Sequence, residues 1–235
     1  MTDTRREIEQ GLIALEIEHT DEQVYALERH LHLVAAANSA FNLTAIPAEE
    51  SVRLHLLDSV TALPFLTAAP GGQFADLGSG AGFPGIPLAV LSGRHVTLVE
   101  SVKKKATFLE STISELRLEA TVQGVRAEEL ADECAGAYSA VTARAVSSLP
   151  SVVELAAPLL IEGGVLICLK GAPDETELTR GDLVARRCGM VRVGATRVEV
   201  PGVEARRTIV VYRCSGLSAV SLPRRNGMAQ RQPLA

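Results

Sequence analysis

Apolar residues recur every three or four positions over the first forty residues of the chain. They are Ile8, Leu12 and Leu15 in one segment and Val24, Leu27, Leu31 and Val34 in the next. This spacing places them on one face of a helix, so it predicts a helical segment over residues 4–39, with Thr20 or Asp21 capping its second helix. A further helical segment is expected over residues 48–66, after a break at Pro47.

From residue 73 onward, short apolar runs alternate with amphipathic segments, which is typical of a parallel sheet covered by helices on both faces. The expected strands are 73–77, 95–100, 120–125, 140–143 and 165–170, and the expected helical segments are 84–91, 103–116, 128–134, 149–160 and 175–188. Two more strands, 191–200 and 208–213, follow one another across a Pro-Gly pair, which predicts an antiparallel hairpin at one sheet edge. The fold class is therefore α/β, with a mostly parallel seven-stranded sheet.

The pattern divides the chain into a helical extension (1–68), an α/β domain (69–222) and a basic tail (223–235) that we expect to be loose. A length of 235 residues suits such an arrangement. With 47% apolar and 22% charged residues, the chain is neither wholly disordered nor collagen-like. It has no signal-peptide core and no 18-residue apolar run, so we expect a soluble cytoplasmic protein without a membrane partner.

The net charge of -5, taken over the whole chain, argues against a nucleic-acid partner, but the charges are unevenly distributed along the chain. The last 56 residues hold eleven bases against three acids, and every one of those bases is Arg, which binds phosphate bidentately. Charge alone leaves an RNA-binding edge and a solvated basic surface equally open. The four cysteines are scattered without CxxC spacing, so no metal site is expected.

The strongest local signal is a strand that runs into a glycine-rich turn and then a helix. Asp76 precedes Gly78, Gly80 and Gly82 in this turn, and Phe83 follows them. Glycines allow a ligand to approach the backbone, and the next helix directs its positive end there. A dinucleotide fingerprint would need glycine at position 83, so the spacing instead looks like the cofactor loop of S-adenosylmethionine-dependent methyltransferases. A purely structural tight turn is the alternative.

Glu100 ends the next strand, 22 residues after Gly78. A carboxylate in this position can accept hydrogen bonds from both hydroxyls of a ribose, as it does in nucleotide-binding sheets of either kind. The alternative is an ordinary acid that interacts with the dipole of the following helix.

Polar residues also follow the later strands, where an open α/β sheet forms its ligand crevice. Arg126 and Glu128 follow the third strand, Arg144 the fourth and Lys170 the fifth. Arg144 suits a charged ligand, with a salt bridge at the rim of the crevice as the alternative. His55, Asp58 and Ser59 are close in sequence, but their spacing on a helix predicts packing or capping rather than hydrolysis.

Several short motifs carry a resemblance to a known family. They are Asn42-Leu-Thr-Ala-Ile46, His55-Leu-Leu-Asp-Ser59, Asp76-Leu-Gly-Ser-Gly-Ala-Gly-Phe-Pro-Gly85, Arg126-Ala-Glu128, Thr142-Ala-Arg-Ala145, Leu169-Lys-Gly171, Pro223-Arg-Arg-Asn-Gly227 and Gln232-Pro-Leu234. Together they closely resemble the bacterial ribosomal RNA small subunit methyltransferase G family, also called glucose-inhibited division protein B. The first forty residues match it only in helical character.

The resemblance implies a class I, Rossmann-like methyltransferase that transfers a methyl group from S-adenosylmethionine to nitrogen 7 of one guanosine in the 530 loop of 16S rRNA. Its partner would be the 16S rRNA or the small ribosomal subunit, and we expect a monomer. The family analogy gives cofactor contacts to Gly78, Phe83, Ala127, Glu128 and Arg144, and Phe83 is the one aromatic residue placed to touch a ligand. The motif adds Asp76, Gly80, Gly82 and Glu100 to the cofactor set, although many relatives carry Asp where this chain has Glu100.

Guanine nitrogen 7 already has an in-plane lone pair, so we expect no general base. We hypothesise that Arg126, Arg144, Lys170 and Arg207 grip the RNA or organise the crevice. Two alternatives stay open. A Rossmann-type NAD-dependent dehydrogenase would share the strand, turn and acid, and a non-catalytic RNA-binding protein could retain the whole fold.

Overall fold

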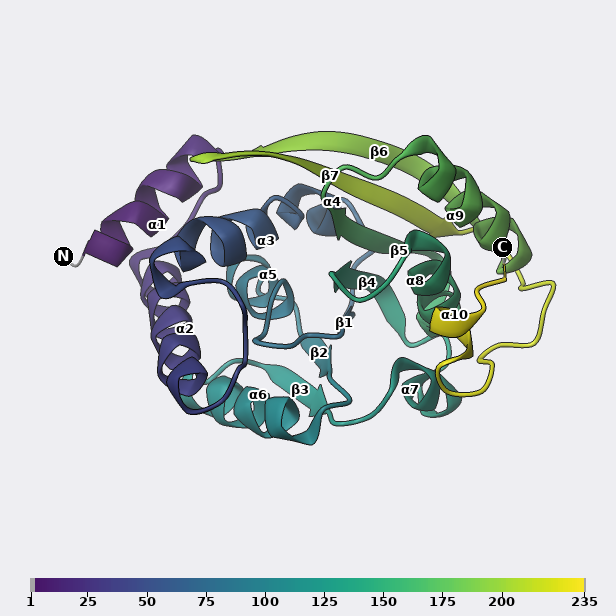
Figure 1. Cartoon of the computed structure of the whole chain (residues 1–235), viewed down its shortest axis with the longest axis horizontal. Helices are drawn as coiled ribbons and strands as arrows, with labels where there is room; N and C mark the ends of the chain where they lie inside the picture. Colours follow the sequence, from purple (N-terminus) through teal and green to yellow (C-terminus); the bar gives the residue numbers. More distant parts are fainter. Residues whose placement is uncertain (1–2, 235) are drawn as a thin grey trace.

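The computed structural model describes residues 3–234 and contains one seven-stranded sheet with the order β3-β2-β1-β4-β5-β7-β6 (Figure 1). The strands are β1 (Phe74–Leu77), β2 (Val96–Val99), β3 (Ala120–Gln123), β4 (Tyr138–Arg144), β5 (Leu160–Lys170), β6 (Met190–Val200) and β7 (Val203–Cys214). Strands β1 to β5 pair in parallel, whereas β7 runs antiparallel to both β5 and β6. The predicted α/β class and terminal hairpin are confirmed.

Helices connect the strands and precede the first one. They are α1 (Asp3–Ala14), α2 (Asp21–Ala40), α3 (Asp58–Val60), α4 (Leu63–Thr67), α5 (Gly85–Ser92), α6 (Lys103–Glu115), α7 (Ala127–Glu133), α8 (Leu149–Ala156), α9 (Glu175–Arg187) and α10 (Met228–Arg231). Short 3-10 turns occupy Ala48–Glu50 (η1) and Ala157–Leu159 (η3), and a π-helical turn, η2, occupies Val52–Leu57. The segment predicted as one helix over 48–66 is therefore four short pieces.

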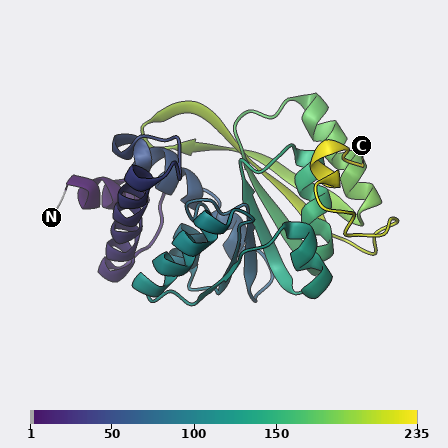
Figure 2. The same cartoon turned by 60° about the horizontal axis from the view of Figure 1, so that its bottom comes forward.

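Helices cover both faces of the sheet (Figure 2), and an apolar cluster lies between the helices and the sheet on each face. On one face, Leu130 of α7, Val153 of α8 and Val184 of α9 belong to a single buried cluster. On the other face, Leu66 of α4 and Leu109 of α6 belong to a second cluster, together with residues of α5. Burial on both sides explains why the central strands read as nearly continuous apolar runs in the sequence.

The N-terminal helices form a third apolar cluster at the carboxyl edge of the sheet. Ile8 of α1 and Leu27 of α2 lie in this cluster together with Phe83 of the glycine turn and Val200 near the tip of the hairpin. Of the two candidate caps, Thr20 is the one used, because its hydroxyl accepts from the backbone N–H of the third helical residue in a capping box. The helical extension thus packs directly beside the turn that carries the candidate site.

Residues 223–234 pack on the domain, so the expectation of a loose tail is wrong for the part of the tail that the structure describes. Ala229 of α10 is buried, and Leu222 and Leu234 pack against the cluster beneath α8. These few apolar contacts fix the tail to the domain. No helix among residues 3–234 is long and apolar enough to cross a membrane.

Candidate active site

The glycine turn joins β1 to α5 as the sequence predicts. Gly78, Gly80 and Gly82 all have positive φ angles, of 65°, 56° and 92°. Side chains strongly disfavour this conformation, so the turn requires glycine at these positions. At Gly78, a Cβ atom would also lie 2.8 Å from Val146, which follows β4. The turn therefore combines a left-handed backbone with close approach of the β4 loop.

Asp76 lies beneath this turn and holds it in place. Its Oδ2 accepts from the backbone N–H of Gly85 at 3.2 Å, and its Oδ1 accepts from the Thr142 hydroxyl at 2.7 Å. Burial raises the pKa of this carboxyl to about 6, although the hydrogen bonds oppose the shift. Because Asp76 is completely buried, its side chain acts on the turn rather than on a ligand.

Glu100 stands at the end of β2 and faces the turn. Its Oε2 accepts from the N–H of Gly80 at 3.0 Å, and its Oε1 accepts from the N–H of Val102, the residue that caps α6, at 2.8 Å. The carboxylate is therefore held by two backbone amides. Each of its oxygens still has a second lone pair with which to accept a hydrogen bond from a ligand.

A pocket opens between Glu100 and the glycine turn, at the carboxyl ends of β1, β2 and β3. Its lining residues are Leu77, Gly78, Val99, Glu100, Ser101, Val125, Arg126, Ala127, Glu128, Val146, Leu155 and Gln230. The lining combines aliphatic side chains with the polar groups of Glu100, Ser101, Arg126, Glu128 and Gln230. This donor and acceptor set fits a nucleoside, whose flat base needs apolar walls and whose ribose hydroxyls need a carboxylate.

The start of α7 forms one end of this pocket. Glu128 is 5% exposed, and its Oε1 accepts from the N–H of Gly227 at 2.7 Å. Ala127 is half-buried beside it, while the Arg126 side chain is exposed. Contact between Glu128 and the C-terminal segment is one feature that sequence reasoning missed, since 99 residues separate the two partners.

Phe83 lies on the opposite side of the turn. Its ring is stacked between His30 and His55, with 4.5 Å between centroids in both pairs, and it is 4% exposed. A Cβ on Gly82 would meet Ile86 and His30, so this glycine also faces the helical extension. The expectation that the Phe83 ring is placed to touch a ligand is therefore wrong, because the ring fills the junction with the N-terminal helices.

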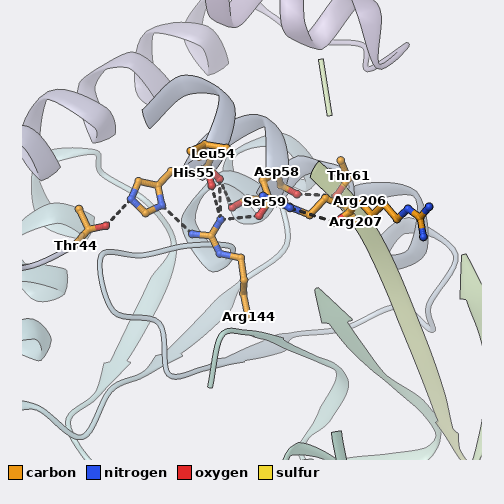
Figure 3. Close-up of polar contacts among 9 residues, drawn as sticks. All are labelled: Thr44, Leu54, His55, Asp58, Ser59, Thr61, Arg144, Arg206 and Arg207. Atoms are coloured by element: carbon orange, nitrogen blue, oxygen red, sulfur yellow. Dashed lines mark hydrogen bonds and ion pairs between the residues drawn. The ribbon is translucent and has the colours of Figure 1, made fainter. Parts of the chain in front are cut away.

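Arg144 joins β4 to the π-helical turn η2 (Figure 3). Its Nη1 donates to the Leu54 carbonyl at 3.1 Å and to Asp58 Oδ2 at 2.9 Å, and its Nη2 lies 2.9 Å from His55 Nδ1. The other oxygen of Asp58 accepts from Arg207 Nε at 2.6 Å. Arg144 and Arg207, two of the predicted RNA contacts, thus share the buried carboxylate of Asp58. For Arg144, this is the salt bridge that the sequence left open as the alternative.

The histidines at this junction are neutral. Burial and the nearby Arg144 lower the pKa of His55 to about 3, and burial lowers the pKa of His30 to about 4. His55 Nε2 lies 2.8 Å from the Thr44 hydroxyl, and the Ser59 hydroxyl donates to the carbonyl of His55. The predicted packing role of His55, Asp58 and Ser59 is confirmed, since none of them is arranged as a nucleophile and base.

Lys170 is also paired within the protein. Its Nζ lies 2.8 Å from Glu177 Oε1 and donates to the Ser147 carbonyl at 3.3 Å. The Glu177 carboxylate in turn accepts from the N–H of Leu149 at the start of α8. Lys170 therefore braces the loop after β4 against α9.

The fold and the site together define a class of protein. A sheet of order 3-2-1-4-5-7-6 with one antiparallel strand, a glycine turn after β1 and a carboxylate after β2 are the features of a class I methyltransferase. The 1,6-didemethyltoxoflavin-N1-methyltransferase of Burkholderia thailandensis shares this fold with a TM-score of 0.55 at 14% identity, over 85% of this chain and 92% of its own.

Sequence comparison identifies the family. A family model described as rRNA small subunit methyltransferase G matches residues 23–208. The ribosomal RNA small subunit methyltransferase G of Pelotomaculum thermopropionicum is 36% identical over 232 residues, 97% of each chain. Its namesake in Stenotrophomonas maltophilia is 41% identical over 206 residues, 86% of this chain and 92% of its own. The chain belongs to the rRNA small subunit methyltransferase G family, which favours a methyltransferase over the dehydrogenase alternative.

Proposed function

We propose that this protein transfers a methyl group from S-adenosylmethionine to nitrogen 7 of a single guanosine in 16S rRNA. The observation that carries the proposal is the orientation of Glu100, which two backbone amides hold at the pocket beside the glycine turn. Family membership supports the choice of rRNA as the substrate. We further propose that the protein acts in the cytoplasm as a monomer.

The pocket residues have separate roles in holding the cofactor. Glu100 would accept hydrogen bonds from the ribose hydroxyls, while the backbone of Ala127 and the carboxylate of Glu128 would bind the edge of the adenine. Gly78 and Gly80 would let the remainder of the cofactor approach the backbone. When bound, S-adenosylmethionine supplies an electrophilic methyl group on a sulfonium centre.

The protein needs no general base for this reaction. Guanine nitrogen 7 attacks with an existing lone pair, so no proton has to leave it before the methyl group arrives. The work of the chain is to align the two reactants and exclude water, which can lower the barrier by about 7–11 kcal/mol at best. The rigid glycine turn, fixed from below by Asp76, serves that alignment.

We propose two exposed arginines, Arg197 and Arg206, as phosphate contacts for the RNA. Lys170 pairs with Thr208 in the sheet, and Thr208 pairs with Arg197 on its other side, so these residues form one row on one face. Arg206 precedes Thr208 by two residues and shares that face. In the part of the chain that the structure describes, neither arginine side chain has a hydrogen-bonding or ionic partner, and Arg206 points away from Asp58 (Figure 3).

Arg144 and Arg207, by contrast, organise the crevice. Their shared contact with Asp58 fixes the end of β4 and the start of β7 to the helical extension. Arg126 remains a candidate phosphate contact, because its side chain is exposed beside the pocket. Of the four cations proposed from the sequence, Arg144, Lys170 and Arg207 are therefore paired within the protein, and Arg126 is the exposed candidate for a phosphate contact.

Labelled S-adenosylmethionine tests the proposal directly. The protein is incubated with naked 16S rRNA, with a partly assembled small subunit and with the complete subunit, and the modified nucleotide is mapped. We expect label at nitrogen 7 of one guanosine in at least one of the three. Label on protein or on a small molecule alone would contradict the rRNA substrate. Cofactor binding without any transfer would favour the non-catalytic alternative.

A further inference from the structure

The last twelve described residues, 223–234, fold back over the domain and form what we name the C-terminal clasp. The clasp contains the short helix α10 and lies against α8 (Figure 1). Ala229 is 2% exposed, so the clasp is seated on the domain through an apolar contact as well as polar ones.

A buried ion pair fixes the base of the clasp. Arg224 donates from Nε to Glu154 Oε1 at 2.6 Å and from Nη2 to Glu154 Oε2 at 2.7 Å, a bidentate arrangement. Glu154 is 3% exposed, and it also accepts from the N–H of Leu234 at 3.2 Å. The Nη2 of Arg224 bonds the Gln232 carbonyl as well, at 2.6 Å. A single arginine therefore ties both ends of the clasp to one carboxylate of α8.

The turn of the clasp binds the start of α7. Gly227 adopts a φ of 78° and directs its N–H to Glu128, while the Asn226 side-chain amide donates to Glu129 Oε1 at 2.6 Å. Glu128 is the carboxylate that we assign to the adenine end of the pocket. The hydrogen bond from Gly227 of the clasp thus orients the Glu128 side chain.

The clasp also reaches the pocket itself. Gln230 of α10 is one of the lining residues, on the same pocket as Gly78 and Glu100. Leu155 and Glu128 line this pocket and also a small cavity beneath the clasp, where they meet Pro223 and Arg224. The seat of the clasp and the pocket therefore share a wall.

The three arginines of the clasp have different surroundings. Arg224 pairs with Glu154, and Arg231 donates to the carbonyls of Asn226 and Gly227. Arg225 and Arg231 are both exposed, and Arg225 has no side-chain partner among residues 3–234. Arg224 is therefore the clasp arginine whose charge is neutralised within the protein.

We infer that the C-terminal clasp is the closing wall of the cofactor pocket and that Arg224 is a positioning residue for cofactor binding. The inference rests on the proposed function, since it requires the pocket to bind S-adenosylmethionine. Cofactor binds the clasped state, so releasing the clasp lowers the fraction of protein that is competent to bind and weakens the apparent affinity by that fraction.

The neighbouring arginines provide a matched test. Arg224→Ala and Arg225→Ala remove the same charge from adjacent positions, but only the first breaks the bond to Glu154. In calorimetric titrations with S-adenosylhomocysteine, we expect Arg224→Ala to weaken binding about tenfold or more, and Arg225→Ala to stay within about twofold of wild type. In steady-state assays, Arg224→Ala should raise the KM for S-adenosylmethionine and leave kcat unchanged at saturation.

Two further measurements separate positioning from a loss of folding. S-adenosylhomocysteine should slow tryptic cleavage after Arg225 in wild-type protein, because a ligand that favours the clasped state protects it reciprocally. If circular dichroism shows that Arg224→Ala is unfolded, Gln230→Ala replaces it. The Gln230 side chain is exposed, lines the pocket and makes no hydrogen bond to any of residues 3–234, and we expect its removal to weaken the affinity several-fold.

The outcomes are distinct. If wild-type protein does not bind S-adenosylhomocysteine at all, the proposed function itself fails. If wild type binds and folded Arg224→Ala binds equally well, or loses only RNA affinity, the clasp is not the wall of the pocket and the inference is overturned.

Discussion

The two sides of the carboxyl edge hold their carboxylates in different ways. On the side of β1 to β3, Glu100 is bound by the backbone amides of Gly80 and Val102. On the side of β4 to β7, Asp58 is bound by the guanidinium groups of Arg144 and Arg207. Backbone amides orient a carboxylate and leave its negative charge uncompensated, so it can still bind a ligand. Arginines neutralise the charge and make it part of the structure.

This difference assigns separate tasks to the two sides. The first is the candidate cofactor pocket, where Glu100 is held by backbone amides and not by a cation. The second is a junction that fixes the N-terminal helices, β4 and the hairpin to one another, with Phe83 stacked at its centre. A charged residue that follows a strand is therefore interpreted by the groups that already neutralise it.

Removing Asp58 should have the largest effect, and the effect should be on stability. Asp58→Ala leaves two mostly buried guanidinium groups without their carboxylate, so we expect a loss of about 3–5 kcal/mol in the free energy of unfolding by urea. Glu115→Ala breaks the exposed pair with Arg29 and serves as the control, with about 0–1 kcal/mol. Equal losses in the two variants would contradict the junction role.

Changing Glu100 should act on binding rather than on the junction. Glu100→Gln removes the negative charge that faces the pocket, and loss of charge-assisted hydrogen bonds costs about 1.5–3 kcal/mol, or about 10–100-fold in the Kd for S-adenosylhomocysteine. Glu100→Asp retains the charge and should recover most of the affinity. Glu110→Gln, on the exposed face of α6, is the matched control. An unchanged Kd in Glu100→Gln would remove the basis of the cofactor assignment.

Acid should destabilise the protein through the junction and not through Asp76. The pKa values of His30 and His55 are lowered in the folded state, so unfolding takes up protons and stability falls as pH drops from about 6.5 toward 4. The pKa of Asp76 is raised to about 6, so between pH 3.8 and 6 the folded state binds the extra proton, which opposes that fall.

Asp76→Asn removes the opposing contribution. Its unfolding free energy should therefore decline more steeply than that of wild type between pH 6 and 4, by at most about 1.4 kcal/mol per pH unit for one proton. Urea titrations at half-unit pH intervals measure both slopes. A shallower slope in the variant would show that the Asp76 carboxyl is not the protonated group.

The smallest effect is expected from the exposed row on the hairpin. Replacing both Arg197 and Arg206 by Ala should reduce the slope of log affinity for the RNA against log salt by about 2, and it should leave S-adenosylhomocysteine binding unchanged. Arg213→Ala is the control, because Arg213 is exposed on β7 but lies near the opposite end of that strand. A similar change in Arg213→Ala would indicate only a general charge effect.

The strands, most helices and the glycine turn could be predicted because their signals are local. Alternating apolar runs mark buried strands, and the turn needs glycine for its positive φ angles. The pairing of Asp58 with Arg207 could not be predicted, because 149 residues separate them and neither local sequence contains a signal that indicates the other residue. The same applies to Arg224 and Glu154, whose pairing turns a basic tail into part of the fold.

Phe83 shows a further limit of the sequence. The local sequence predicts that Phe83 lies in the glycine turn. It does not predict whether the ring points toward the pocket or toward the N-terminal helices. The side is decided by His30, 53 positions earlier in the chain, and by His55, which together form the slot that the ring fills. Motifs therefore located the site, and long-range packing decided which of its residues face the pocket.

The most direct test of this division of labour is a two-by-two comparison of dissociation constants. S-adenosylhomocysteine and substrate RNA are each titrated into Glu100→Gln and into the Arg197→Ala/Arg206→Ala double variant. We predict that the first variant loses cofactor affinity and retains RNA affinity, and that the second does the reverse. Loss of both affinities in both folded variants would contradict the separation of the pocket from the RNA-binding row.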